Sequence, residues 1–135
     1  NNVLEIGTGC GYQAAVLSEI VGKKGKVVTI ERIKELADFA SKNLLKCGYV
    51  NVVVIEGDGT EGYAKYTPYD RIIVTARSPE IPSLLVAQLK IKGKMVIPVE
   101  DGLYMVEKIS KTETEKTFLG YYAFVPLIGK YGYKE

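Results

Sequence analysis

The sequence predicts an α/β fold with a doubly wound, mostly parallel sheet that ends in an antiparallel hairpin. Short β-rich runs alternate with helical patterns, glycine and proline separate them, and the rhythm changes after Pro98. The 135 residues are 47% hydrophobic and 25% charged, values typical of one globular domain that buries its own core. We therefore expect a single domain, residues 1–135.

Five short apolar runs are rich in β-branched residues and are expected to be strands: Val3–Ile6, Lys26–Ile30, Val52–Glu56, Arg71–Thr75 and Lys94–Pro98. Near-continuous apolar runs of this length are typical of parallel strands covered on both faces. Helical patterns between such runs predict βαβ units.

The helices are predicted from the spacing of apolar residues. Ile33–Cys47 has apolar residues at steps of three and four, charged residues on the other face, and Gly48 as a C-terminal stop. Tyr12–Val21 has a broad apolar face, and a short helix is expected at Ser83–Leu89 after Pro82.

After Pro98 two strand-like runs, Leu103–Ser110 and Lys116–Val125, are joined by the polar segment Lys111–Glu115. This connection is too short for a crossover helix. The sequence therefore predicts an antiparallel hairpin at the edge of the sheet.

Composition excludes several mechanisms within these residues. There is no histidine, which excludes a Ser-His-Asp or Cys-His pair and a histidine zinc site, so no metal is expected. A formal net charge of +2 gives no reason to expect nucleic acid as a partner. Cys10 and Cys47 lack CxxC spacing, so we expect reduced thiols in a cytoplasmic protein. No apolar run of the sequence is long enough to span a membrane.

A glycine-rich loop, Glu5–Tyr12 (EIGTGCGY), is placed where the first strand turns into the first helix. In an open α/β sheet this turn is where nucleotides bind, and glycines let a ligand approach the main chain. Glu31 ends the second strand at the spacing of a ribose-binding acid, and Gly57–Thr60 (GDGT) follows the third strand at the same edge. The alternative interpretation, that this glycine-rich turn binds no ligand, is less favoured.

The loop spacing has two interpretations. As E-x-G-x-G-x-G it suits an S-adenosylmethionine site, whereas Gly9–Ala14 also satisfies the dinucleotide pattern G-x-G-x-x-A, which leaves an NAD-dependent oxidoreductase open. Glu5 favours the methyl donor, because a carboxylate there repels a pyrophosphate but helps to order an amino-acid end. The GDGT turn favours it as well.

The segments VLEIGTGCGYQAA, VTIER, IEGDGT, YDRIIVTARSPEIP and FVPLIGKYG together resemble the protein-L-isoaspartate O-methyltransferase family over essentially all 135 residues. The resemblance implies a Rossmann-like methyltransferase fold. It also implies an enzyme that moves a methyl group from S-adenosylmethionine to the α-carboxyl of L-isoaspartyl residues in damaged proteins, leaving S-adenosylhomocysteine. The ester then cyclises to a succinimide, which makes the reaction a protein repair.

The resemblance also implies roles for individual residues. The expected cofactor-binding residues are Glu5, Gly7, Thr8, Gly9, Gly11, Glu31, Asp58 and Gly59. Thr75 and Ala76 are expected to border the transferred methyl, and the stretch Phe124, Val125 and Pro126 to shape the substrate site. Two departures stand out: Arg77-Ser78 replace small apolar residues of the family, and Cys10 replaces a small or hydroxyl residue.

Members of the family carry a sizeable segment before the VLEIG motif, with a hydroxyl-bearing motif that contacts the substrate carboxylate. The sequence in hand starts at Asn1-Asn2, which leads us to expect an N-terminally truncated fragment. The expected partners are isoaspartyl proteins and peptides, and a monomer is expected. The alternatives are a cofactor-binding fragment with little activity and a related methyltransferase with a small-molecule substrate.

Overall fold

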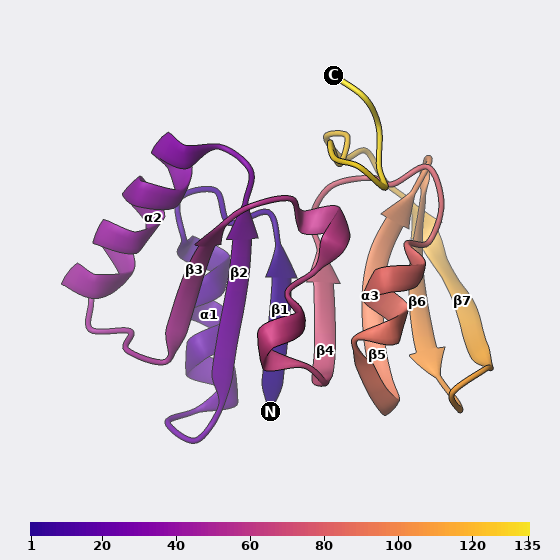
Figure 1. Ribbon diagram of the computed structural model, residues 1–135, viewed down its shortest axis with the longest axis horizontal. Coiled ribbons are helices and arrows are strands. Elements are labelled where there is room, and N and C mark those ends of the chain that lie inside the picture. The colour runs from indigo at the N-terminus through magenta and orange to yellow at the C-terminus, as the bar shows by residue number, and fades with distance from the viewer.

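A seven-stranded sheet forms the centre of the computed structural model, which describes residues 1–135. The strands are β1 (Asn2–Ile6), β2 (Lys26–Glu31), β3 (Val52–Glu56), β4 (Tyr69–Val74), β5 (Leu89–Val99), β6 (Gly102–Lys108) and β7 (Thr114–Tyr121). They lie in the order β3-β2-β1-β4-β5-β6-β7 (Figure 1). The first five run parallel, and β6 and β7 are antiparallel to their neighbours. The predicted parallel sheet with a terminal hairpin is confirmed.

Helices cover both faces of this sheet. α1 (Tyr12–Val21) and α2 (Lys34–Lys46) lie on one face, and the short α3 (Ser83–Ala87) lies on the other (Figure 1). Two short 3-10 helices, η1 (Gly59–Glu61) and η2 (Ala64–Tyr66), connect β3 to β4. The doubly wound arrangement expected from the alternating pattern is therefore present.

The two faces have separate hydrophobic cores because successive side chains of a strand point to opposite sides. Leu4 and Val28 pack with Leu85 of α3, whereas Val3 and Val27 pack with Leu17 of α1. Burying each such aliphatic side chain contributes about 1.5–3 kcal/mol. Strands with apolar residues at consecutive positions are thus stabilised from both sides.

Several predicted boundaries are wrong, most of them by one or two residues. The final strand ends at Tyr121 rather than Val125, because the chain leaves the sheet edge and Val125 instead accepts a hydrogen bond from the backbone N–H of Arg77 at 2.7 Å. The helix predicted to reach Leu89 ends at Ala87. Leu89 pairs with Tyr69, so β5 begins there and extends beyond the predicted Lys94–Pro98.

The carboxyl ends of β1 to β5 meet at one edge of the sheet, and the connecting loops gather there. The C-terminal segment, residues 122–135, returns across this edge and lies above it (Figure 1). Crevices at this edge are the usual ligand sites of open α/β sheets. No helix in the structure has the length and apolar character that crossing a membrane requires.

Candidate functional site

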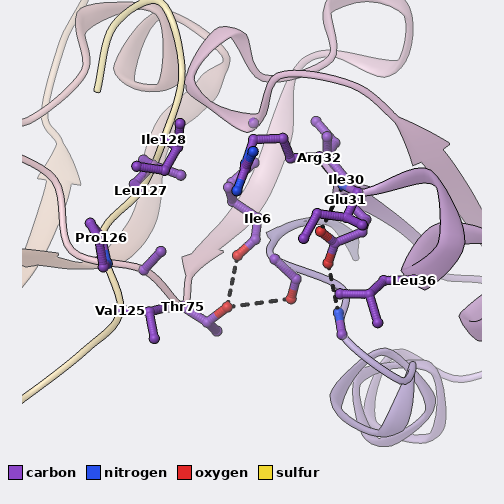
Figure 2. Close-up of a pocket in the computed structure, with 15 residues that line it drawn as sticks. Ile6, Ile30, Glu31, Arg32, Leu36, Thr75, Val125, Pro126, Leu127 and Ile128 are labelled. Atoms are coloured by element: carbon purple, nitrogen blue, oxygen red, sulfur yellow. Dashed lines mark hydrogen bonds between the residues drawn. The ribbon is translucent and has the colours of Figure 1, made fainter. Parts of the chain in front are cut away.

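A cavity of about 330 Å³ lies at the carboxyl edge of the sheet, between the loops after β1, β2 and β4 and the C-terminal segment (Figure 2). Its size falls within the range of small-molecule sites. Its lining residues are Ile6, Gly7, Gly9, Ile30, Glu31, Arg32, Ile33, Leu36, Gly59, Thr75, Ala76, Val125, Pro126, Leu127 and Ile128. Eight of these were expected from the sequence: Gly7, Gly9, Glu31, Gly59, Thr75, Ala76, Val125 and Pro126.

The glycine loop takes a backbone conformation that other residues resist. Gly7 has φ +98°, and a Cβ there would stand 2.5 Å from the Thr75 hydroxyl oxygen. Gly9 has φ +55°, and a Cβ there would meet nothing within 4 Å. Gly7 is therefore required by packing against Thr75, whereas Gly9 borders open space that a ligand can enter.

Glu31 joins the glycine loop to the start of α2. One carboxylate oxygen accepts the Gly9 N–H at 3.0 Å, and the other accepts the Ile33 N–H at 3.1 Å. The second bond explains why Ile33 is extended and α2 begins at Lys34 rather than at the predicted Ile33. The Glu31 side chain is only 8% exposed but lines the cavity, so its remaining lone pairs are available to hydroxyl donors there (Figure 2).

Thr75 is held against the end of β1. Its hydroxyl donates to the Ile6 carbonyl at 2.8 Å, and its backbone N–H donates to the same oxygen at 3.1 Å. Figure 2 shows this side chain at the wall of the cavity beside Val125. Since the hydroxyl proton is used within the protein, Thr75 and Ala76 offer the cavity a shaped wall rather than a proton donor.

Asp58 connects the loop after β3 with the C-terminal segment. Its Oδ1 accepts the Thr60 N–H at 2.9 Å and hydroxyl at 2.6 Å, and its Oδ2 accepts the Lys130 N–H at 2.8 Å. Partial burial opposes the charge of Asp58, but these hydrogen bonds outweigh it and hold the pKa below the usual value. Asp58 does not line the cavity, although its neighbour Gly59 does.

Glu5, Thr8 and Gly11 lie outside the cavity wall. Glu5 and Thr8 are buried beneath the loop, 0% and 4% exposed, and both hydrogen-bond to Thr29 of β2. Gly11 precedes α1 in a left-handed conformation and packs near Leu44. These residues support the loop from below.

Phe124 lies in a second, more open groove beside the cavity, together with Arg77 and Tyr133. The Arg77 guanidinium stands 4.9 Å from the centre of the Tyr133 ring. Phe124 and Val125 therefore face different hollows, which meet where the backbone of the C-terminal segment pairs with Arg77.

Several lining residues were missed by sequence reasoning, namely Ile6, Ile30, Arg32, Ile33, Leu36, Leu127 and Ile128. Leu127 and Ile128 follow Pro126 directly and continue an apolar run without a strand or helix period, a signal that could have extended the expected site. Arg32 also contacts Glu135, so the C-terminal segment spans the cavity from Val125 to the start of α2.

The sequence profile of the protein-L-isoaspartate (D-aspartate) O-methyltransferases matches residues 1–132. The chain belongs to this family. It is 57% identical to protein-L-isoaspartate O-methyltransferase 1 of Archaeoglobus fulgidus over 135 residues, 98% of this chain. It is 54% identical to the Staphylothermus marinus enzyme over 145 aligned residues, 100% of this chain. The chain spans 62% and 64% of the length of these two relatives.

Solved structures of the methyltransferase family agree with the sequence match. A protein-L-isoaspartate O-methyltransferase superposes with a TM-score of 0.92 at 33% identity, covering 97% of this chain and 43% of the other. A Plasmodium falciparum family member in complex with S-adenosyl-L-homocysteine gives 0.79 at 26% identity, covering 94% of this chain and 65% of the other. The Rossmann-like methyltransferase fold is thus shown for this chain.

The residues around the cavity suit a nucleoside-containing ligand of the kind these enzymes use. The space beside Gly9 is open, the Glu31 carboxylate has free lone pairs for hydroxyl groups, and Ile30, Leu36 and Leu127 supply apolar walls. Apolar walls with a few placed polar groups are typical of small-molecule and cofactor sites.

Proposed function

We propose that this protein binds S-adenosylmethionine in the 330 Å³ cavity and transfers its methyl group to the α-carboxyl of L-isoaspartyl residues in damaged proteins. The observation that carries the proposal is the hydrogen bonding of the three loop glycines. The N–H of Gly7 donates to Ile30 O at 2.9 Å, that of Gly9 to Glu31 at 3.0 Å, and that of Gly11 to Thr8 O at 3.1 Å.

This arrangement disfavours a dinucleotide. A pyrophosphate is held by unpaired loop N–H groups, and it is repelled by a nearby carboxylate. Here the three glycine N–H groups already have acceptors, and the Glu31 carboxylate bonds directly to one of them. A sugar hydroxyl, which donates a hydrogen bond, is the better partner for Glu31.

We assign the cavity residues accordingly. Glu31 accepts the ribose hydroxyls, and Gly59, backed by Asp58, borders the adenine. Gly7 and Gly9 allow the ligand to approach the main chain, with Thr8 and Gly11 shaping the same loop. Thr75 and Ala76 wall the methyl end, and Val125 and Phe124 lead from the cavity to the neighbouring groove, where we place the substrate peptide.

The proposed reaction requires little acid–base catalysis from the protein. Bound S-adenosylmethionine supplies an electrophilic methyl group on a positively charged sulfur. An α-carboxyl with a pKa of roughly 3.3–3.7 is already ionised at neutral pH, so no general base is required. The protein contributes alignment of the two groups and exclusion of water. The absence of histidine from these residues is compatible with this reaction.

We further propose that the protein works in the cytoplasm as a monomer on isoaspartyl proteins and peptides. Two free, exposed cysteines, Cys10 and Cys47, fit a reducing compartment. A formal net charge of +2 gives nucleic acid little electrostatic attraction.

A methyl-transfer assay with paired peptides tests the proposed substrate. The protein is incubated with methyl-labelled S-adenosylmethionine and a peptide containing either L-isoaspartate or L-aspartate at one position. We expect base-labile label in the isoaspartyl peptide only. Equal label in both peptides, or label that resists mild base, would exclude the proposed α-carboxyl esterification.

A further inference from the structure

Three buried side chains form a continuous hydrogen-bonded chain beneath the glycine loop. The Thr29 hydroxyl donates to Glu5 Oε1 at 2.6 Å, and the Thr29 and Thr8 hydroxyl oxygens lie 2.7 Å apart. Glu5 and Thr29 are 0% exposed and pair across β1 and β2. The chain therefore links the interior of the sheet to the loop that borders the cavity.

Glu5 is incompletely satisfied in this position. Its second oxygen, Oε2, is buried and has no hydrogen-bond partner. The charged group that acts on it is Glu31 of β2, while β4 places the apolar Ile73 beside it. On the same face α1 and α2 bury only uncharged residues, namely Ala14, Leu17 and Ser18 of α1 and Ala37, Ala40 and Leu44 of α2. No cation compensates a charge at Glu5.

Burial raises the pKa of Glu5 to about 7, with the hydrogen bond from Thr29 acting against this rise and the charge of Glu31 adding to it. Both protonation states are therefore accessible near neutral pH. Removal of the Thr29 hydroxyl would leave the ionised form of Glu5 with no donor at either oxygen.

The ionisation of Glu5 sets the direction of the hydrogen-bonded chain. An ionised carboxylate only accepts, so the Thr29 proton points to Glu5 and the Thr8 proton points to Thr29. When Glu5 is protonated, it can donate to Thr29, and the two threonine protons are free to reverse. Thr8 lies between Gly7 and Gly9, which both line the cavity, so this reversal takes place directly beneath the proposed cofactor site.

We propose that Thr29 is a positioning residue of this site. Its hydroxyl favours the ionised form of Glu5 and links Thr8 to Glu5 by hydrogen bonds. The buried negative charge of Glu5 then favours the binding of the cationic methyl donor over the binding of its neutral product. The inference rests on the proposed function. S-adenosylmethionine and S-adenosylhomocysteine differ by one methyl group and one positive charge, so a charge beneath the loop discriminates between them.

The first experiment needs no ligand. The carboxyl carbon of Glu5 is followed by NMR as a function of pH in the wild type, Thr29→Val and Thr29→Ser. We expect the midpoint to move upward by about one pH unit in Thr29→Val, the size of a lost hydrogen bond to a charged group, and to return in Thr29→Ser. Val28→Ala, on the same strand but facing the other core, controls for lost packing and should leave the midpoint in place.

The second experiment measures the affinities for S-adenosylmethionine and S-adenosylhomocysteine between pH 5.5 and about pH 8.5, a range that brackets the Glu5 titration. In the wild type the preference for the cationic ligand should rise about tenfold with pH. In Thr29→Val the rise should move to higher pH, and in Glu5→Gln, which cannot ionise, it should vanish. Glu5→Gln keeps the test valid if Thr29→Val does not fold.

The two experiments distinguish the role of Thr29 from the proposed function of the protein. An unchanged Glu5 midpoint in Thr29→Val, or a pH dependence that persists in Glu5→Gln, would overturn the role of Thr29. If neither ligand binds the wild type while the NMR titration behaves as expected, the proposed function fails and the link between Thr29 and Glu5 stands.

Discussion

The carboxylate of Asp58 accepts the backbone N–H of Lys130 at 2.8 Å, across 72 residues of sequence. A loop at the end of β3 is thereby joined to the C-terminal segment whose residues Val125 to Ile128 wall the cavity. The same carboxylate holds its own turn through Thr60, and the Thr60 hydroxyl oxygen accepts a second bond from this segment, from the Tyr131 N–H at 3.2 Å.

Asp58→Ala should loosen the C-terminal segment. The change removes the acceptor of the Lys130 N–H and of two Thr60 donors, a loss of about 1–3 kcal/mol in local stability. Hydrogen exchange at the amide of Lys130 should accelerate by about tenfold or more. Asp38→Ala is the matched control, because this exposed aspartate on α2 loses only a surface pair with Lys34. Equal protection of Lys130 in both variants would contradict the proposed connection.

The same contact predicts an acid limit. Because the pKa of Asp58 is held below its ordinary value of 3.8, its contribution to stability is present above that value and is lost as pH falls through the lower folded value. The protection factor of the Lys130 amide, which is the intrinsic exchange rate at the same pH divided by the observed rate, should therefore hold to below pH 4 in the wild type and then fall. In Asp58→Ala the protection factor should show no such fall, which we call the acid step. An acid step of equal size in both proteins would argue against a role for the Asp58 charge.

Glu5 predicts the opposite dependence on pH. With a folded pKa of about 7 against an ordinary 4.5, its contribution is fully present below pH 4.5 and is lost as pH rises through 7. The free energy of unfolding should fall by up to about 3 kcal/mol across this window, and Glu5→Gln should remove most of the fall. Urea unfolding at several pH values measures it. Parallel curves for both proteins would show that Glu5 titrates normally.

Two glycines of the loop should respond differently to alanine. Gly7→Ala places a methyl group against the Thr75 hydroxyl and should cost about 2 kcal/mol or more of stability. Gly9→Ala meets open space and should cost only about 1–2 kcal/mol of backbone strain, while its methyl group obstructs the ligand. Thermal unfolding with calorimetric titration of S-adenosylhomocysteine compares the two. Unimpaired binding by Gly9→Ala would place the ligand elsewhere.

Glu31→Ala should weaken the binding of S-adenosylhomocysteine by about 1–3 kcal/mol, because it removes charge-assisted hydrogen bonds to the ribose. Glu56→Ala is a matched control, since Glu56 is the exposed partner of Glu31 at the end of the neighbouring strand. The measurement is the dissociation constant by calorimetry. An unchanged affinity in Glu31→Ala would remove Glu31 from the site.

The local parts of this fold could be predicted from sequence because their signals are local. Tyr12–Val21 and Val52–Glu56 have the predicted bounds, since apolar spacing and flanking turn residues determine where they begin and end. The glycine loop and Glu31 were also found at the expected edge of the sheet. Their placement follows from the topology of parallel strands.

The remaining features depend on contacts between distant segments. The carbonyl of Val125 accepts the N–H of Arg77, which takes Val125 out of the predicted strand, and the carboxylate of Asp58 accepts the N–H of Lys130. Thr29 looked like one more β-branched strand residue, and only the register of β1 on β2 places it beside Glu5. No local pattern encodes such pairings, so they had to come from the structure.

A calorimetric titration of the 135-residue protein with S-adenosylhomocysteine, and separately with NAD, decides which cofactor the cavity binds. We expect saturable binding of S-adenosylhomocysteine at one site, weakened by Gly9→Ala and Glu31→Ala but not by Glu56→Ala, and no binding of NAD. Tight binding of NAD without binding of S-adenosylhomocysteine would contradict it.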